Sequence, residues 1–226
     1  MKDALLAVDC SLRWTCVAVC RGGEDASAPD AVISERLDLG RRQAAELPLV
    51  VDRVLEKSGR EPRDVVQIAV TNGPGYFTGI RVGVSWATAF AYGLGIRVVP
   101  VSSLLMLAYP YSERGTPALA IVYAGRERVY AASFGCGDDL RAGEHDGESL
   151  RSWLDGHSNP DIAVVSDDPE RACGAVGPIR SIRQELPDAA VVARIARRGK
   201  TAPVSPMEVG VIYHRAPQGY VPAIRD

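Results

Sequence analysis

The chain has 226 residues, with 26 Lys and Arg against 28 Asp and Glu, 46% hydrophobic residues and 24% charged residues. These proportions are those of an ordinary globular protein, and they exclude a disordered, collagenous or coiled-coil chain. A formal net charge of −2 supplies neither the basic field that attracts a nucleic-acid backbone nor a polybasic membrane anchor.

The first half of the chain predicts alternating strands and helices. A pair of β-favouring runs indicates a hairpin, and an amphipathic helix follows, with Pro48 expected near its start and Gly59 at its end. The predicted elements are strands at residues 5–9, 15–21 and 31–37, a helix around 47–55, a strand at 65–71, a helix at about 79–94, a strand at 96–101 and a helix beginning at 102 or 103.

The second half repeats this order in a shorter form. Strands are predicted at residues 118–124, 129–134 and 162–165, with helices near 148–154 and 188–198. The turn residues at 109–117 predict a connection. We therefore expect an α/β protein of two related lobes, residues 1–108 and a degenerate copy at 109–226.

The charge is unevenly distributed. Residues 65–112 contain no Asp, Glu or Lys, and their only charged side chains are Arg81 and Arg97. The uncharged run between these arginines has 15 residues and includes glycine, whereas a membrane span needs about 20 apolar residues. This stretch is therefore predicted to be buried or to contact a partner, without a membrane.

The five cysteines contain no C-x-x-C pair. Cys16 and Cys20 have the same strand parity and would face one side near Cys10, where a metal site is conceivable. No His is near in sequence, so buried structural thiols are the favoured interpretation, with no metal site. The N-terminus lacks the apolar region of a secretory signal, which predicts a cytoplasmic protein with reduced thiols.

A glycine loop at residues 71–79 joins a buried strand to a helix, with Thr78 placed to cap the helix. A dinucleotide-binding fingerprint is disfavoured, because the third glycine is one residue late. The fingerprint also needs an acidic residue about 20 positions further on, and the first acidic residue after the loop is Glu113. A Walker loop is excluded, because the loop has no lysine. A tight turn without a ligand remains an open alternative.

Small residues recur every four positions in the helix after this loop. One row is Gly79, Gly83, Ala87 and Ala91, and the other is Ser85, Ala89 and Gly93. Such rows allow a second helix to approach closely. We expect one row to pack inward and the other to pack against another chain, without deciding which.

The glycine loop resembles a family signature. Residues 73–83, Gly-Pro-Gly-Tyr-Phe-Thr-Gly-Ile-Arg-Val-Gly, are similar to the signature of the TsaB (YeaZ) family, the catalytically degenerate partners in bacterial synthesis of threonylcarbamoyladenosine on transfer RNA. The chain departs from the family pattern at Arg42, where a His is common, at Tyr76, where a Ser is usual, and at Tyr123-Ala124-Gly125, which replaces Asp-Ala-Arg. The similarity extends to residues 6–9, 16–19, 47–48, 91–96, 101–104, 129–130 and 213–215.

This resemblance implies an actin-like (RNase H-like) ATPase fold, in which each lobe is a mixed sheet flanked by helices. It implies a homodimer in isolation and a heterodimer with the catalytic paralogue TsaD, joined by a TsaE-like ATPase. Transfer RNA, modified at position 37, would be contacted indirectly through the complex. The residues expected at the partner interface are Leu47, Val51, Gly79, Arg81, Gly83, Val84, Ala87 and Ala91.

The residues do not complete an active site. A nucleotide site would use Asp9, Gly73, Gly75 and Thr78, with ATP or ADP and Mg²⁺ at a complex interface as the candidate cofactor. The second lobe lacks a glycine-rich phosphate loop, and the three histidines do not form an H-x-x-x-H pair. No catalytic residue is assigned. The hypothesis is a non-catalytic scaffold and activator, and the alternative is an ATPase or sugar-kinase-like enzyme using Asp9 and the glycine loop.

Overall fold

The computed structural model describes residues 3–21, 32–137, 140–157, 161–179 and 181–213. Two five-stranded sheets form its framework. The first has the order β3 (Ile33–Leu37), β2 (Thr15–Arg21), β1 (Ala4–Asp9), β4 (Val65–Thr71), β5 (Arg97–Val101). The second has the order β10 (Arg183–Gln184), β9 (Ala163–Ser166), β6 (Ala118–Gly125), β7 (Arg128–Phe134), β8 (Gly143–His145).

The two sheets follow the same pairing rule. In the first, β1, β2 and β3 pair antiparallel, while β4 and β5 are added in parallel. In the second, β6, β7 and β8 pair antiparallel, while β9 and β10 are added in parallel. The predicted repetition of two mixed sheets is therefore confirmed.

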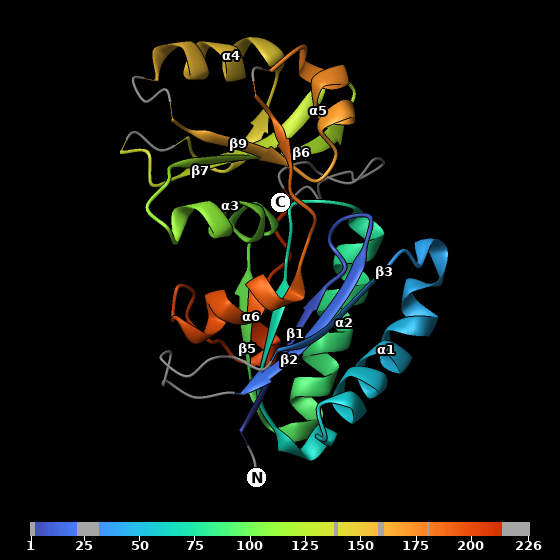
Figure 1. Ribbon diagram of the computed structural model, residues 1–226. Helices are drawn as coiled ribbons and strands as arrows, with labels where there is room; N and C mark the ends of the chain where they lie inside the picture. The colour runs from blue at the N-terminus through green and yellow to red at the C-terminus, as the bar shows by residue number, and fades with distance from the viewer. Residues whose placement is uncertain (1–2, 22–31, 138–139, 158–160, 180, 214–226) are drawn as a thin grey trace, which may run out of the picture.

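Helices separate and cover the sheets (Figure 1). One face of the first sheet carries α1 and α2, and the outer face of the second carries α4 and α5. Between the sheets, α6 packs on the first and α3 on the second. The helices are α1 (Gln43–Lys57), α2 (Phe77–Leu94), α3 (Ser103–Ser112), α4 (Gly147–Gly156), α5 (Pro169–Val176) and α6 (Ala189–Arg197), with short 3₁₀ turns at Gly40–Arg42, Pro62–Asp64 and Pro206–Glu208.

Strand alternation divides the interior into layers. On β1, Leu6 and Val8 face the core under α1 and α2, while Leu5 and Ala7 face the central core. Successive side chains of a strand point to opposite faces, so a strand covered on both sides contains a continuous apolar run. All six residues of β1 are buried for this reason.

The central core joins the two lobes. Leu5 of β1, Leu107 of α3, Ala120 of β6 and Val192 of α6 all belong to it. The predicted division between residues 108 and 109 falls inside α3, and the turn-rich connection begins only after Ser112. The division into two lobes at this point stays a prediction. One element crosses it, because α6 belongs to residues 109–226 but lies on the first sheet.

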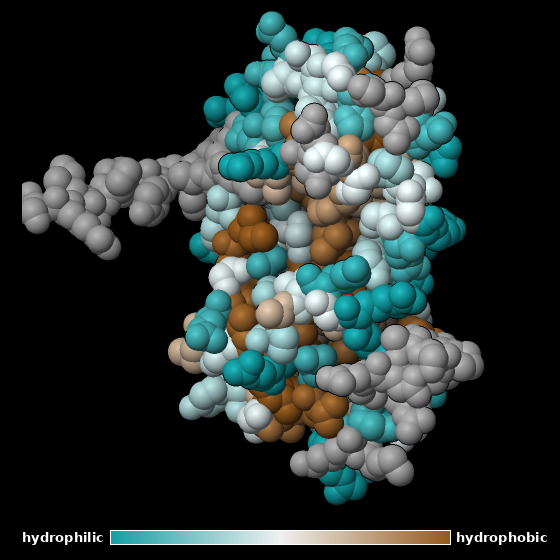
Figure 2. Space-filling view, turned by 90° about the vertical axis from the view of Figure 1, so that its left-hand side faces the viewer, coloured by the Kyte–Doolittle hydropathy of each residue, from teal (hydrophilic) through white to brown (hydrophobic). Residues whose placement is uncertain are grey.

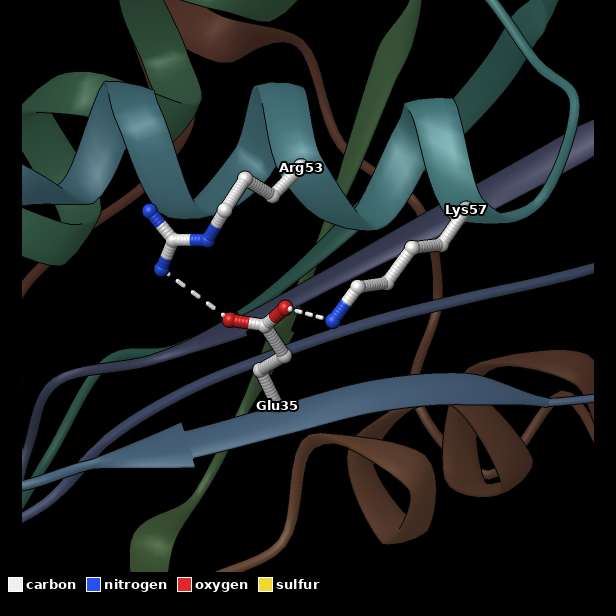
Figure 3. A network of polar contacts seen from close by, with 3 residues as sticks. All are labelled: Glu35, Arg53 and Lys57. Carbon is white, nitrogen blue, oxygen red and sulfur yellow. Dashed lines mark hydrogen bonds and ion pairs between the residues drawn. The ribbon is translucent and has the colours of Figure 1, made fainter.

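An ion-pair network fixes α1 to the edge strand β3 (Figure 3). Glu35 accepts hydrogen bonds from Lys57 Nζ at 2.7 Å and from Arg53 Nη2 at 3.0 Å. The bond from Lys57, with that from Arg53, lowers the pKa of Glu35. The apolar stripe predicted for α1 is confirmed, but Pro48 lies inside the helix rather than at its start.

Candidate functional site

The glycine loop packs against the end of the first strand. A Cβ added at Gly75 would lie 2.1 Å from the Ser11 carbonyl oxygen, and one at Gly79 would lie 2.0 Å from the Cys10 carbonyl oxygen. These distances are far shorter than van der Waals contact. The two glycines are therefore required so that backbone can approach backbone.

The other side of the loop is covered by the C-terminal segment. The Ile212 amide donates to the Asn72 carbonyl at 2.8 Å, and Asn72 Nδ2 donates to the Gly210 carbonyl at 2.9 Å. Gly73 has a φ of +107°, and a Cβ there would lie 2.8 Å from the Ile212 carbonyl oxygen. The chain's own backbone thus fills the space around this loop.

Asp9, at the end of β1, is a buried structural carboxylate. Its Oδ1 accepts hydrogen bonds from the Ser11 amide at 2.9 Å, from the Ser11 hydroxyl at 2.6 Å and from the Thr71 hydroxyl. Burial raises its pKa, against the lowering effect of these bonds. Oδ2 has no hydrogen-bond partner among the described residues. Asp9 therefore links the ends of β1 and β4 beneath the glycine loop.

The structure brings the predicted nucleotide residues together but does not shape them for phosphates. The close approaches of Gly73 and Gly75 are to the chain's own carbonyl oxygens, which repel anions. Thr78 is exposed in the first turn of α2, and no side chain caps this helix, so the predicted capping by Thr78 is wrong. These contacts favour the tight-turn alternative over a phosphate-binding loop, and nucleotide binding stays a prediction.

The thiols are buried on two faces of the first sheet. Cys16 and Cys20 face the central core, as their shared parity predicts, while Cys10 faces the core under α1 and α2. Burial raises the pKa of all three thiols, to about 11 for Cys20. Within the described ranges, no three His, Cys, Asp or Glu side chains are grouped to hold a metal ion. The three cysteines therefore do not share one face, as the conceivable metal site near Cys10 would require.

The two rows of small residues on α2 have opposite environments. Gly79, Gly83, Ala87 and Ala91 are buried against the first sheet, where Gly83 packs on Cys10. Ser85, Ala89 and Gly93 are exposed. The structure therefore identifies the outward row, which the spacing left open.

Most of the residues expected at a partner interface point into the chain's own core. Only Arg81 among them is exposed, because α1 and α2 turn the other predicted residues toward the first sheet. In the single chain the buried residues are not accessible to a partner, and the location of a partner interface stays a prediction. The buried residues are Leu47, Val51, Gly79, Gly83, Val84, Ala87 and Ala91.

Exposed apolar side chains accompany the outward row. Tyr92 and Leu94 are exposed at one end of α2, and Leu49 is exposed on α1. At the other end, Arg81 stacks on Phe77, with its guanidinium carbon 3.8 Å from the ring centroid, and its Nε donates to the Tyr213 hydroxyl at 2.9 Å. The α2 sequence contains no charged residue besides Arg81.

Sequence reasoning missed α5, β8 and β10. A local signal for α5 was present, because Asp168 caps the helix through the Arg171 amide at 3.0 Å and Pro169 occupies its first position. Arg171 gives no such local signal, because it contacts Tyr123 and Tyr76, which precede it by 48 and 95 positions in the sequence.

Asp167 supplies a pH-dependent prediction. Burial, together with the nearby charges of Asp168 and Asp9, raises its pKa to about 6. Between pH 4 and 6 the folded protein therefore binds more protons than the unfolded chain, so Asp167 destabilises the fold as pH rises through this window. Asp167→Asn should raise the free energy of unfolding by about 1 to 3 kcal/mol at pH 8.

At pH 4 the same substitution should have little effect, because the carboxyl is then protonated in the folded protein. Urea denaturation at the two pH values measures the difference. An equal effect at both would show that the Asp167 charge is not the cause.

Two solved structures share this fold. YeaZ from Pseudomonas aeruginosa superposes with a TM-score of 0.72, covering 93% of this chain and 99% of its own. A structure from the same organism, described as an uncharacterized protein with similarity to peptidase YEAZ, gives 0.74 and covers 94% and 100%. Each is 23% identical. The protein thus has the two-lobed actin-like (RNase H-like) fold, as predicted.

Sequence comparison adds the family relation. Residues 38–145 match the family model TsaD: tRNA N6-adenosine threonylcarbamoyltransferase. Proteins of that name from Streptococcus suis (strain 05ZYH33) and Jannaschia sp. (strain CCS1) are 33% and 32% identical over 153 and 136 residues. These matches cover 60% and 54% of this chain but only 45% and 37% of the relatives, so the chain spans less than half their length. The predicted resemblance to the TsaB (YeaZ) family is thereby confirmed.

Proposed function

We propose that this protein is a non-catalytic scaffold and activator subunit, which pairs with a catalytic TsaD-like paralogue to make threonylcarbamoyladenosine at position 37 of tRNAs. The observation that carries the proposal is the outward face of α2, which is exposed, formed by small and apolar side chains, and free of charge except for Arg81. Such a face favours docking by shape and apolar contact.

The distribution of small and apolar residues supports the outward side of α2 as the docking face. Figure 2 shows a different side of the molecule, away from α1, where hydrophobic residues form separate patches among hydrophilic ones. In α2 the small residues of the outward row recur from Ser85 to Gly93, and a partner helix can lie along this part of it. The same face serves a second copy of the chain in isolation and the catalytic paralogue in the complex.

The glycine loop argues for an accessory rather than a catalytic role. Its glycines are used in packing against Ser11, Cys10 and Ile212, which leaves no phosphate cradle. The alternative, an ATPase or sugar-kinase-like enzyme, depends on Asp9, whose Oδ2 has no partner among the described residues. The two functions differ in what the isolated protein does with ATP.

No helix within the described part of the chain is long and apolar enough to cross a membrane. A cytoplasmic location belongs to this proposal, because tRNA and the catalytic paralogue are found there. ATP or ADP with Mg²⁺ would enter through the complex, and tRNA would be contacted through the catalytic subunit and the TsaE-like ATPase.

Reconstitution tests the proposal. The purified protein, the TsaD-like and TsaE-like proteins of the same cell, tRNA, ATP and a threonylcarbamoyl donor should form the modified nucleoside, and omission of this protein should abolish its formation. The protein alone should neither bind Mg-ATP at micromolar concentration in calorimetry nor hydrolyse it. Micromolar binding with hydrolysis by the protein alone would establish the enzyme alternative.

A further inference from the structure

Arg171 on α5 joins two tyrosines that belong to different lobes. Its Nη1 donates a hydrogen bond to the Tyr76 hydroxyl at 2.8 Å, and its guanidinium carbon lies 4.3 Å from the centroid of the Tyr123 ring. Tyr76 immediately precedes α2 in the first lobe, and Tyr123 lies on β6 in the second. A single side chain therefore bridges the glycine loop and the β6–β7 hairpin.

The backbone of Tyr76 is itself anchored to the first sheet. Its amide donates to the Ser11 carbonyl at 2.7 Å, next to the close approach of Gly75 to the same oxygen. Arg171 is held on its side by α5, whose residues Ala172 and Val176 are buried under the second sheet. Because both ends are fixed to rigid elements, the contact constrains the distance between the lobes.

This contact lies away from the elements that carry the chain between the lobes. Figure 1 shows α3 between the two sheets, while the first turn of α2 lies below α5 on the other side of the molecule. A core at one side alone permits a change of angle between two lobes, and a second contact at the other side fixes that angle. Arg171 provides such a second contact.

A pocket of about 330 Å³ opens beside the contact. Tyr123 and Arg171 line it together with Arg126 and Glu127 of the β6–β7 turn, both of which have positive φ, at 48° and 58°. Arg171 therefore borders this pocket and also contacts the residue that precedes α2.

We propose that Tyr76, Arg171 and Tyr123 form a clasp that fixes the start of α2 to α5 and β6, and that its release lets the two lobes change their relative angle about the central core. The clasp consists of one hydrogen bond from a charged donor and one cation–π contact, and Arg171 is exposed. Contacts of this kind are modest in strength, so the clasp is reversible.

Hydrogen exchange of the full chain tests the clasp. Arg171→Ala should raise the exchange rate of the amides of Gly73, Gly75 and Tyr76 and of residues 123–128 by roughly three- to tenfold, because both segments lose their shared contact. Amides in β1 and β4 should keep their rates. Glu170→Gln, at the exposed neighbouring position on α5, is the matched control and should leave both segments unchanged.

Tyr76→Phe gives a second, milder variant, since it removes only the hydroxyl. It should raise exchange at both segments, and adding it to Arg171→Ala should produce no further rise, because the two residues share one bond. Unchanged rates at the two segments in Arg171→Ala would overturn the clasp. So would a rise spread equally over all amides, which would reflect lost global stability, or a double variant in which the two effects multiply.

Discussion

Gly79→Ala should unfold the protein or remove most of its stability. The added Cβ would lie 2.0 Å from the Cys10 carbonyl oxygen, at the end of the central strand β1. Neither partner can move cheaply, because β1 is paired on both sides and α2 is packed along the first sheet. The expected cost exceeds about 4 kcal/mol, against the roughly 5 to 15 kcal/mol that stabilise a typical domain.

Gly93→Ala is the matched control on the same helix. A Cβ at Gly93 meets nothing within 4 Å among the described residues, and its φ is not in the left-handed region. Alanine there should stabilise the protein by about 0.5 to 1 kcal/mol, because it restricts the unfolded chain and favours the helix. Denaturation midpoints measure both variants. A Gly79→Ala protein with the wild-type midpoint would refute the close packing of α2 on β1.

Ala89→Arg should abolish self-association and association with the catalytic paralogue. Ala89 is the middle residue of the outward row on α2, and the new side chain would place a long, charged group at the centre of the proposed contact. Burying an unpaired charge costs several kcal/mol, so we expect the dissociation constant to increase by about 100-fold or more. Light scattering measures this change.

The fold of the variant should be intact, because residue 89 is exposed in the single chain. Circular dichroism should show this. Ser152→Arg, at an exposed position on α4, adds the same side chain far from α2 and should leave association unchanged. If Ala89→Arg associates as tightly as the wild type, the outward row is not the docking face.

The sequence predicts the framework of this fold because the framework depends on periodic patterns. Strand alternation and the i, i+3, i+4 spacing of Leu47, Val50 and Val51 are local properties, and the structure confirms both. The glycine loop also has a local signature. Its role in packing does not, because this depends on the carbonyl oxygens of Ser11 and Ile212, far away in the chain.

The choice between the two rows of α2 illustrates the same limit. Both rows have the same spacing and small side chains, so periodicity finds two candidates and cannot rank them. What ranks them is the position of the Cys10 backbone beside Gly79 and Gly83. Likewise, Tyr76 and Tyr123 stand out as departures from the family pattern, but only the folded chain brings both to Arg171.

The position of α6 has a consequence for synthesis of the protein. This helix is encoded near the C-terminus, at Ala189–Arg197, yet it covers the face of the first sheet formed by β1 and β2. During translation the N-terminal strands leave the ribosome with this apolar face uncovered, and α6 can bury it only after residue 197 has been synthesised. Such long-range closure slows folding and exposes the nascent chain to aggregation.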